Sequence, residues 1–296
     1  MNMGLGKTKL YLELVRFSHT LFALPFALAS MLVAASGLPS WRVFVVILVC
    51  MATARNSAMA FNRLIDARFD AQNPRTAKRH IPAGLLSQTQ VKWFIATNGI
   101  LFVAAAGTLN QLALLCAIPV WCFLLSYSYW KRMSWTCHLF LGLAIGLSPL
   151  GAWIAVRGEF AWFPGLLGLM LALWITGFDI IYATQDEAAD KALGLHSIPV
   201  RFGTPLALRI AAGTHVVMLL VSCVLGLLFH LSWLWWGMVL TIALLLTYIH
   251  YFRTSSDLDR MNRDFFLANV FISILCFLGL AAETFLMNGV SFVSRI

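Results

Sequence analysis

The sequence predicts an all-α polytopic membrane protein with about nine transmembrane helices around a central cavity. Of its 296 residues, 60% are hydrophobic and only 11% are charged, whereas a soluble domain has about 45–50% apolar and about 25% charged residues. Nine apolar stretches come close to the roughly 20 residues that a spanning helix needs. They lie at residues 15–36, 41–61, 93–109, 111–130, 135–156, 161–182, 209–229, 232–252 and 267–288. Little of the chain remains for a soluble domain, so we expect residues 1–296 to form a single transmembrane domain.

The first stretch, 15–36, follows the basic residues Lys7 and Lys9 and contains Arg16 near its start. A basic segment before an apolar run is also typical of a signal peptide. This stretch is long, however, and eight others follow it. We therefore interpret it as an uncleaved first helix.

The positive charge is distributed as in a membrane protein rather than a nucleic-acid-binding one. The formal net charge is +9, from 21 Lys and Arg against 12 Asp and Glu. When the loops are assigned alternately to the two sides of the membrane, Arg42, Arg157 and Arg295 fall on one side and nearly all the others on the opposite side. Basic residues are enriched in cytoplasmic loops. We therefore expect a cytoplasmic N-terminus, a C-terminus across the bilayer and no nucleic-acid partner.

Two acidic segments begin where an apolar stretch meets a polar loop on the cytoplasmic side. The first acidic segment consists of Asn62, Asp66 and Asp70, and the second of Asp179, Asp186 and Asp190. Steps of four and seven residues place side chains on one face of a helix. Like charges at this spacing repel one another unless a cation lies between them. Each segment therefore predicts a bound divalent cation.

The two acidic segments are related by a constant offset. Asp66 and Asp186 are 120 residues apart, and so are Asp70 and Asp190. Duplication of a four-helix unit is one interpretation of this pattern, although the halves share little else. With or without a duplication, two carboxylate rows on one side of the membrane can face each other across a cavity.

The loops after these segments, at 71–90 and 191–208, are longer than the roughly 12–15 residues beyond which loops are usually functional. Mg²⁺ binds carboxylates together with water and substrate phosphates. Arginine also suits a diphosphate, because its guanidinium donates two parallel hydrogen bonds. The basic residues that follow the first segment are Arg75, Lys78, Arg79, Lys131 and Arg132. They predict a diphosphate site, and ordinary positive-inside topology is the alternative.

Arg55 is a charge inside a predicted span, which makes it a candidate for a functional site. It precedes Asn62 by seven residues, so it lies about 10 Å deeper on the same helix face. A second anion at this depth indicates a second substrate, such as an aromatic carboxylate. An interior ion pair with Asp66 or another member of the acidic segments is the alternative. Arg16 is a weaker candidate, because a basic residue at a helix end can also extend toward the interface.

A diphosphate that enters a bilayer is most simply attached to a polyprenyl chain, which apolar side chains can surround. The lone histidines within or beside spans, such as His19, His138 and His215, are expected to be packed or hydrogen-bonded residues.

At these motifs the chain resembles the UbiA superfamily of intramembrane aromatic prenyltransferases. Residues 62–70 (NRLIDARFD) and 73–84 (NPRTAKRHIPAG) are similar to the family's first motif and its loop. The second motif matches at the residues Asp179, Tyr182, Asp186 and Asp190, at 194–199 (GLHSIP) and at 201–203 (RFG). Residues 127–132 (YSYWKR) resemble a further Tyr-x-x-x-Lys-Arg element. The resemblance covers nearly the whole chain.

The resemblance implies Mg²⁺-dependent transfer of a polyprenyl group from its diphosphate to an aromatic acid, most simply 4-hydroxybenzoate, in respiratory quinone biosynthesis. It assigns one metal to Asn62, Asp66 and Asp70 and the other to Asp186 and Asp190, with Asp179 and Tyr182 in support. It assigns the diphosphate to Arg75, Arg79, Lys131 and Arg132, and the acceptor carboxylate to Arg55. It also implies a bacterial inner membrane location with cytoplasmic active-site loops. No obligate protein partner is evident from the sequence.

Two positions depart from the family pattern. Arg63 stands where many members have Asp, and His196 where many have Lys. Together with the 194–199 run, they resemble a branch that serves menaquinone synthesis by the futalosine route, so a different aromatic acceptor is an open alternative. From another class, an organic-anion transporter would also place Arg and Asp near a central cavity.

Overall fold

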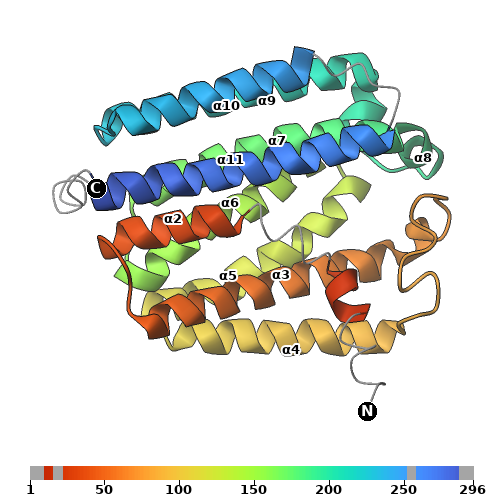
Figure 1. The fold of residues 1–296 in the computed structure, drawn as a ribbon. Helices are drawn as coiled ribbons and strands as arrows, with labels where there is room; N and C mark the ends of the chain where they lie inside the picture. Colours follow the sequence, from red (N-terminus) through yellow and green to blue (C-terminus); the bar gives the residue numbers. More distant parts are fainter. Residues whose placement is uncertain (1–9, 16–22, 252–257, 287–296) are drawn as a thin grey trace. The chain divides into compact units, whose positions relative to one another are not determined.

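The computed structural model describes residues 10–15, 23–251 and 258–286. For residues 258–266 it describes the backbone alone. Within this part the chain is helical and contains no strand (Figure 1). Its elements are α2 (Leu24–Ala35), α3 (Trp41–Asp70), α4 (Gln88–Gly107), α5 (Gln111–Ser126), the 3₁₀ helix η2 (Tyr127–Arg132), α6 (Cys137–Arg157), α7 (Trp162–Ala183), the 3₁₀ helix η3 (Thr184–Asp186), α8 (Glu187–Ala192), α9 (Ile198–Leu228), α10 (Trp233–Tyr251) and α11 (Leu258–Leu286).

Seven helices of the described chain are long and apolar enough to cross a membrane. They lie at Trp41–Asp70, Gln111–Arg132, Cys137–Arg157, Trp162–Ala192, Ile198–Leu228, Trp233–Tyr251 and Leu267–Leu286. Every predicted stretch coincides with part of a helix, but the expected count of about nine spans is not confirmed. Residues 16–22 of the first predicted stretch lie outside the described part of the chain, and the 12 residues of α2 belong to the rest of it. With 20 residues α4 is long enough, but it carries Gln88, Gln90, Lys92 and Asn98.

The chain forms two compact units, and each is described by itself. The first unit contains residues 1–20 and 44–130, and the second contains 21–43 and 131–296.

In the first unit, polar side chains fasten α3 to α4 inside an otherwise apolar contact. The hydroxyl of Ser57 donates to the Ile95 carbonyl at 3.2 Å, and the Asn56 amide donates to Asn98 Oδ1 at 3.2 Å. At the start of α4, Ser87 accepts from the Gln90 amide, and the Gln90 side chain accepts from the Ser87 amide. This capping box satisfies two backbone donors and fixes where the loop after α3 ends.

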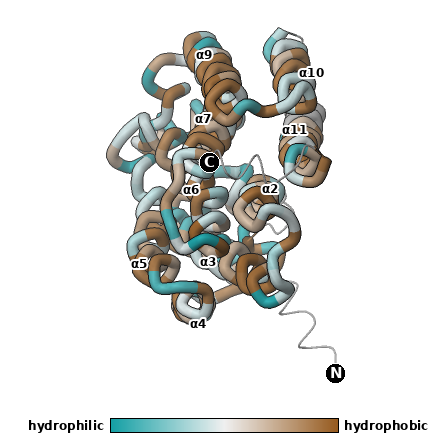
Figure 2. Tube along the Cα trace, turned by 90° about the vertical axis from the view of Figure 1, so that its left-hand side faces the viewer, coloured by the Kyte–Doolittle hydropathy of each residue, from teal (hydrophilic) through white to brown (hydrophobic). Residues whose placement is uncertain are grey.

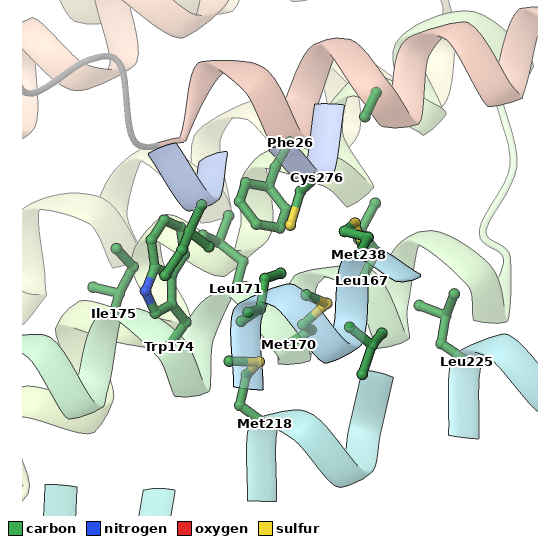
Figure 3. Close-up of a cluster of buried hydrophobic side chains, with 14 of the residues drawn as sticks. Phe26, Leu167, Met170, Leu171, Trp174, Ile175, Met218, Leu225, Met238 and Cys276 are labelled. Carbon is green, nitrogen blue, oxygen red and sulfur yellow. The ribbon is translucent and has the colours of Figure 1, made fainter. Parts of the chain in front are cut away.

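In the second unit, α7 lies at the centre of a large apolar core. Its Leu167, Met170, Leu171 and Trp174 are almost completely buried and pack among side chains of α2, α9, α10 and α11 (Figure 3). Away from this core, most of α9 is hydrophobic (Figure 2), and it exposes Leu220 and other large apolar residues. Such a face suits contact with lipid, so the chain is an integral membrane protein.

The helices α6 and α7 approach one another through glycine. A Cβ atom on Gly168 would overlap the carbonyl oxygen of Gly146, and a Cβ on Gly146 would overlap that of Gly168. Small residues of this kind let membrane helices pack backbone against backbone. The contact therefore fixes the middle of α6 against the first half of α7.

We expect Gly168→Ala to destabilise the protein by about 1–3 kcal/mol, because the added methyl group meets a backbone atom that cannot rotate away. The thermal unfolding midpoint in detergent measures this effect. Gly165→Ala is the matched control on the same helix, because a Cβ there has no neighbour within 4 Å. Equal midpoints for the two variants would contradict the close approach.

A glycine also divides α9. Gly203 has φ 75° and ψ 155°, a backbone conformation that is essentially restricted to glycine. Pro205 follows, and the hydroxyl of Thr204 donates to the Glu187 carboxylate of α8. The short segment 198–202 is therefore separate from the long part of α9, whose first residue is bonded to α8.

Candidate functional site

The first acidic segment occupies the last turns of α3, in the first unit. Asp66 and Asp70 are buried, with exposed fractions of 2% and 5%. The Asn62 amide donates to Asp66 Oδ2 at 3.1 Å. The predicted spacing of four residues therefore does place these groups along one side of the helix.

The loop after α3 folds back onto Asp70. Arg79 Nη1 lies 2.7 Å from Asp70 Oδ1, and the Thr76 hydroxyl donates to the Asp70 backbone carbonyl at 3.0 Å. An Asx turn, in which Asn73 Oδ1 accepts from the Arg75 amide, begins the loop. The sequence predicted Arg75 and Arg79 as anion-binding residues, and Arg79 is held beside the acidic segment.

The other carboxylate oxygen of Asp70, Oδ2, is buried and has no hydrogen-bond partner within the described part of the chain. Buried carboxylate oxygens are rarely left without a donor or a cation. Together with Asn62 and Asp66, it provides the oxygen ligands that a hard divalent ion prefers. No cluster of three His, Cys, Asp or Glu suited to a metal occurs among the described residues, so an ion here would also need Asn, water or substrate oxygens.

Arg55 lies two turns before Asn62 in α3, as expected. Arg55, Arg63 and Asp66 of α3 each lie within electrostatic range of Tyr127 of η2. Arg63, the departure from the family pattern, is buried with 8% exposed. Neither Arg63 nor Tyr127 was predicted as a site residue, because the proximity depends on how η2 turns back toward α3.

The second acidic segment extends from α7 through η3 into α8, in the second unit. Asp179 Oδ2 lies 2.7 Å from Nδ1 of the buried His138. Tyr182, Asp186 and Asp190 follow it and are all partly buried. The 3₁₀ turn at Thr184–Asp186 interrupts the helix, so the spacing of seven residues does not continue one α-helical face.

The loop after α8 is fixed by its backbone. The His196 amide donates to the Lys131 carbonyl at 2.7 Å, and the Cys137 thiol donates to the His196 carbonyl at 3.4 Å. Ser197 caps α9 by accepting from the Val200 amide. Lys131 and Arg132, predicted to bind diphosphate, therefore lie at one edge of this loop.

The predicted site residues divide between the two units. The first unit holds Arg55, Asn62, Asp66, Asp70, Arg75 and Arg79, and the second holds Lys131, Arg132, Asp179, Tyr182, Asp186 and Asp190. That the two acidic segments face each other across a cavity stays a prediction. Arg16 lies outside the described residues.

Comparison with known proteins places this geometry in a family. The model of the UbiA prenyltransferase family matches residues 23–275. The chain is 26% identical to the 4-hydroxybenzoate octaprenyltransferase of Vibrio campbellii, over 94% of this chain and 98% of the relative. The enzyme of the same name from Hydrogenovibrio crunogenus is also 26% identical, over 93% of this chain and 96% of the relative.

Solved structures agree with this assignment. A UbiA homologue from Aeropyrum pernix, in its apo form, has a TM-score of 0.80 and 26% identity, and the match covers 90% of this chain and 98% of that one. A UbiA homologue from Archaeoglobus fulgidus, bound to DMAPP and Mg²⁺, has a TM-score of 0.72 at 19% identity, covering 92% and 99%. The all-helical fold, the apolar spans and the matched family model lead to one conclusion: this chain belongs to the UbiA prenyltransferase family.

Proposed function

We propose that this membrane prenyltransferase transfers a polyprenyl group from polyprenyl diphosphate to an aromatic acid, with 4-hydroxybenzoate as the first candidate acceptor. The observation that carries the proposal is the pairing of a buried acidic row with two arginines in the first unit. Asp70 is bonded to Arg79, and Arg55 lies deeper on the same helix. The names of the bacterial relatives support this acceptor.

Asn62, Asp66 and Asp70 would hold one Mg²⁺ ion, and Asp186 and Asp190 a second. The unpartnered Oδ2 of Asp70 supports this assignment. When bound, Mg²⁺ supplies positive charge that neutralises the leaving diphosphate.

The protein's own residues would bind and orient the two substrates, and one of them would accept a proton. Arg79, oriented by Asp70, has further N–H donors for diphosphate oxygens, and Arg55 would hold the acceptor carboxylate through charge-assisted hydrogen bonds. The allylic C–O bond breaks, the ring carbon ortho to the hydroxyl forms a C–C bond with the prenyl group, and the proton of that carbon leaves. Asp179 is a candidate to accept it, because its carboxylate is 31% exposed.

The membrane orientation is also part of the proposal. The excess of basic residues on one set of loops supports a cytoplasmic position for both acidic segments, and the bacterial relatives support the inner membrane.

Mass spectrometry of products tests this function. Membranes that contain the protein are incubated with Mg²⁺, a long-chain polyprenyl diphosphate and 4-hydroxybenzoate, and we expect a prenylated hydroxybenzoate that disappears with EDTA. Failure to form it, in membranes where the protein is folded, would contradict the proposed acceptor.

The second candidate is a different aromatic acid, from the menaquinone pathway. Arg63 and the 194–199 run distinguish this chain from the common pattern and favour this alternative. To test this alternative, naphthoic acids replace 4-hydroxybenzoate in the same assay, and a prenylated naphthoic acid would identify the acceptor.

A further inference from the structure

One hydrogen-bonded array in the second unit is not explained by the residues assigned so far. His138, the second residue of α6, is buried with 3% of its side chain exposed. Its Nδ1 lies 2.7 Å from Asp179 Oδ2, and its Nε2 lies 3.3 Å from the backbone nitrogen of Ile198. The imidazole therefore connects the end of α7 to the start of α9.

These two contacts determine which ring nitrogen carries the proton. The Ile198 amide can only donate, so Nε2 of His138 must accept. A neutral imidazole that accepts at one nitrogen carries its hydrogen on the other. His138 therefore donates from Nδ1 to the Asp179 carboxylate, and one tautomer satisfies both neighbours.

The surrounding backbone holds the ring in place. The Thr176 hydroxyl lies 3.3 Å from the His138 carbonyl and 2.7 Å from that of Ala172. A Cβ on Gly142 would overlap the same hydroxyl, so α6 and α7 are closely packed at this point. His138 is thus fixed on the helix opposite Asp179.

Exposure separates the roles of the two residues. The Asp179 side chain is about ten times as exposed as that of His138, at 31% against 3%. A ligand can therefore reach the carboxylate, whereas the imidazole lies behind it.

We propose that His138 is a positioning residue that orients Asp179 for prenyl transfer and connects it to the 194–198 loop. This inference rests on the proposed function. When the new C–C bond has formed, the proton of that ring carbon passes to Asp179, and the electron pair of the C–H bond restores the aromatic ring. A charge-assisted hydrogen bond from Nδ1 keeps Asp179 ionised and aimed before this step.

Two substitutions separate the contacts of His138. In His138→Asn, the side-chain amide occupies the region of Nδ1 and can donate to Asp179, but it does not reach Ile198. In His138→Gln, the amide extends to the region of Nε2 and can accept from Ile198, but the Nδ1 donor is lost. The two variants therefore retain opposite halves of the array.

We expect His138→Gln to lower kcat by at least about tenfold, with the KM for polyprenyl diphosphate changed by less than about threefold, and His138→Asn to restore kcat to within about threefold of the wild type. Adding His138→Gln to Asp179→Asn should lower kcat no further than Asp179→Asn alone, since the two residues act as a unit. The proposal would be overturned if kcat of His138→Gln were not lower than kcat of His138→Asn. Equal losses of kcat, or wild-type kcat in His138→Gln, would both have this effect.

Nitrogen-15 NMR of histidine-labelled protein provides a reading that does not depend on activity. The His138 signals are those missing in His138→Asn. We expect a neutral ring protonated at Nδ1, with a shift of this signal in Asp179→Asn. A ring protonated at Nε2 would refute the contact itself, whereas a correct tautomer in a protein that prenylates no aromatic acid would refute only the proposed function.

Discussion

Replacing Asp66 with Asn is expected to lower kcat by at least about a thousandfold at saturating substrate, because it removes a buried negative charge from the first acidic segment without changing side-chain size. Asp66 is 2% exposed and accepts from the Asn62 amide. The substitution therefore removes a candidate metal ligand at its most enclosed position. Product formation in membranes, measured against Mg²⁺ concentration, gives the effect.

The matched control for Asp66→Asn is Glu159→Gln. Glu159 forms an exposed ion pair with Arg157, at the opposite end of α6 from His138. Exposed ion pairs contribute little to protein stability. The control should have wild-type kcat. Retained, Mg²⁺-dependent turnover in Asp66→Asn would exclude the first acidic segment as a metal site.

Replacing Arg55 with Gln is expected to raise the KM for the aromatic acid by roughly 10- to 100-fold, which corresponds to the loss of a hydrogen bond between charged groups worth about 1.5–3 kcal/mol. The KM for polyprenyl diphosphate should remain within about threefold of the wild-type value. Initial rates with each substrate varied in turn make the comparison.

Arg157→Gln is the control for Arg55→Gln, because it removes an exposed arginine and should change neither KM. If Arg55 instead serves as an ion-pair partner of Asp66, the Arg55→Gln variant will have a lower kcat, and the KM values for both substrates will change alike. That result would exclude Arg55 as the residue that recognises the acceptor.

The sequence predicted the positions of the helices well, because each combines a long apolar run with polar residues at its ends. Its expected count of about nine spans was not confirmed, since seven helices of the described residues are long and apolar enough. The polar residues of α4, such as Gln90 and Asn98, do not stop a helix from forming when they cap it or bond within the first unit. They do lower its apolar character.

The first acidic segment was also predictable in part. Within α3, the spacing of Asn62, Asp66 and Asp70 determines their common side, since a helix repeats every 3.6 residues. The contact between Arg79 and Asp70 depends on a loop that turns back, and no periodicity encodes it. His138 was expected only to be packed or hydrogen-bonded, because its partner Asp179 is 41 residues away and the two meet through the close packing of α6 and α7.

The division of α9 at Gly203 has a consequence for how the enzyme responds to its lipid environment. A transmembrane helix tilts when the bilayer becomes thinner or thicker. The Thr204 hydroxyl bonds to Glu187 of α8, and the backbone at Gly203 departs from helical geometry. We therefore expect a change in the tilt of the long part of α9 to pivot about this end. We then expect the segment 198–202, whose Ile198 amide donates to His138, not to rotate with the helix. The geometry near the second acidic segment should therefore change little with membrane thickness.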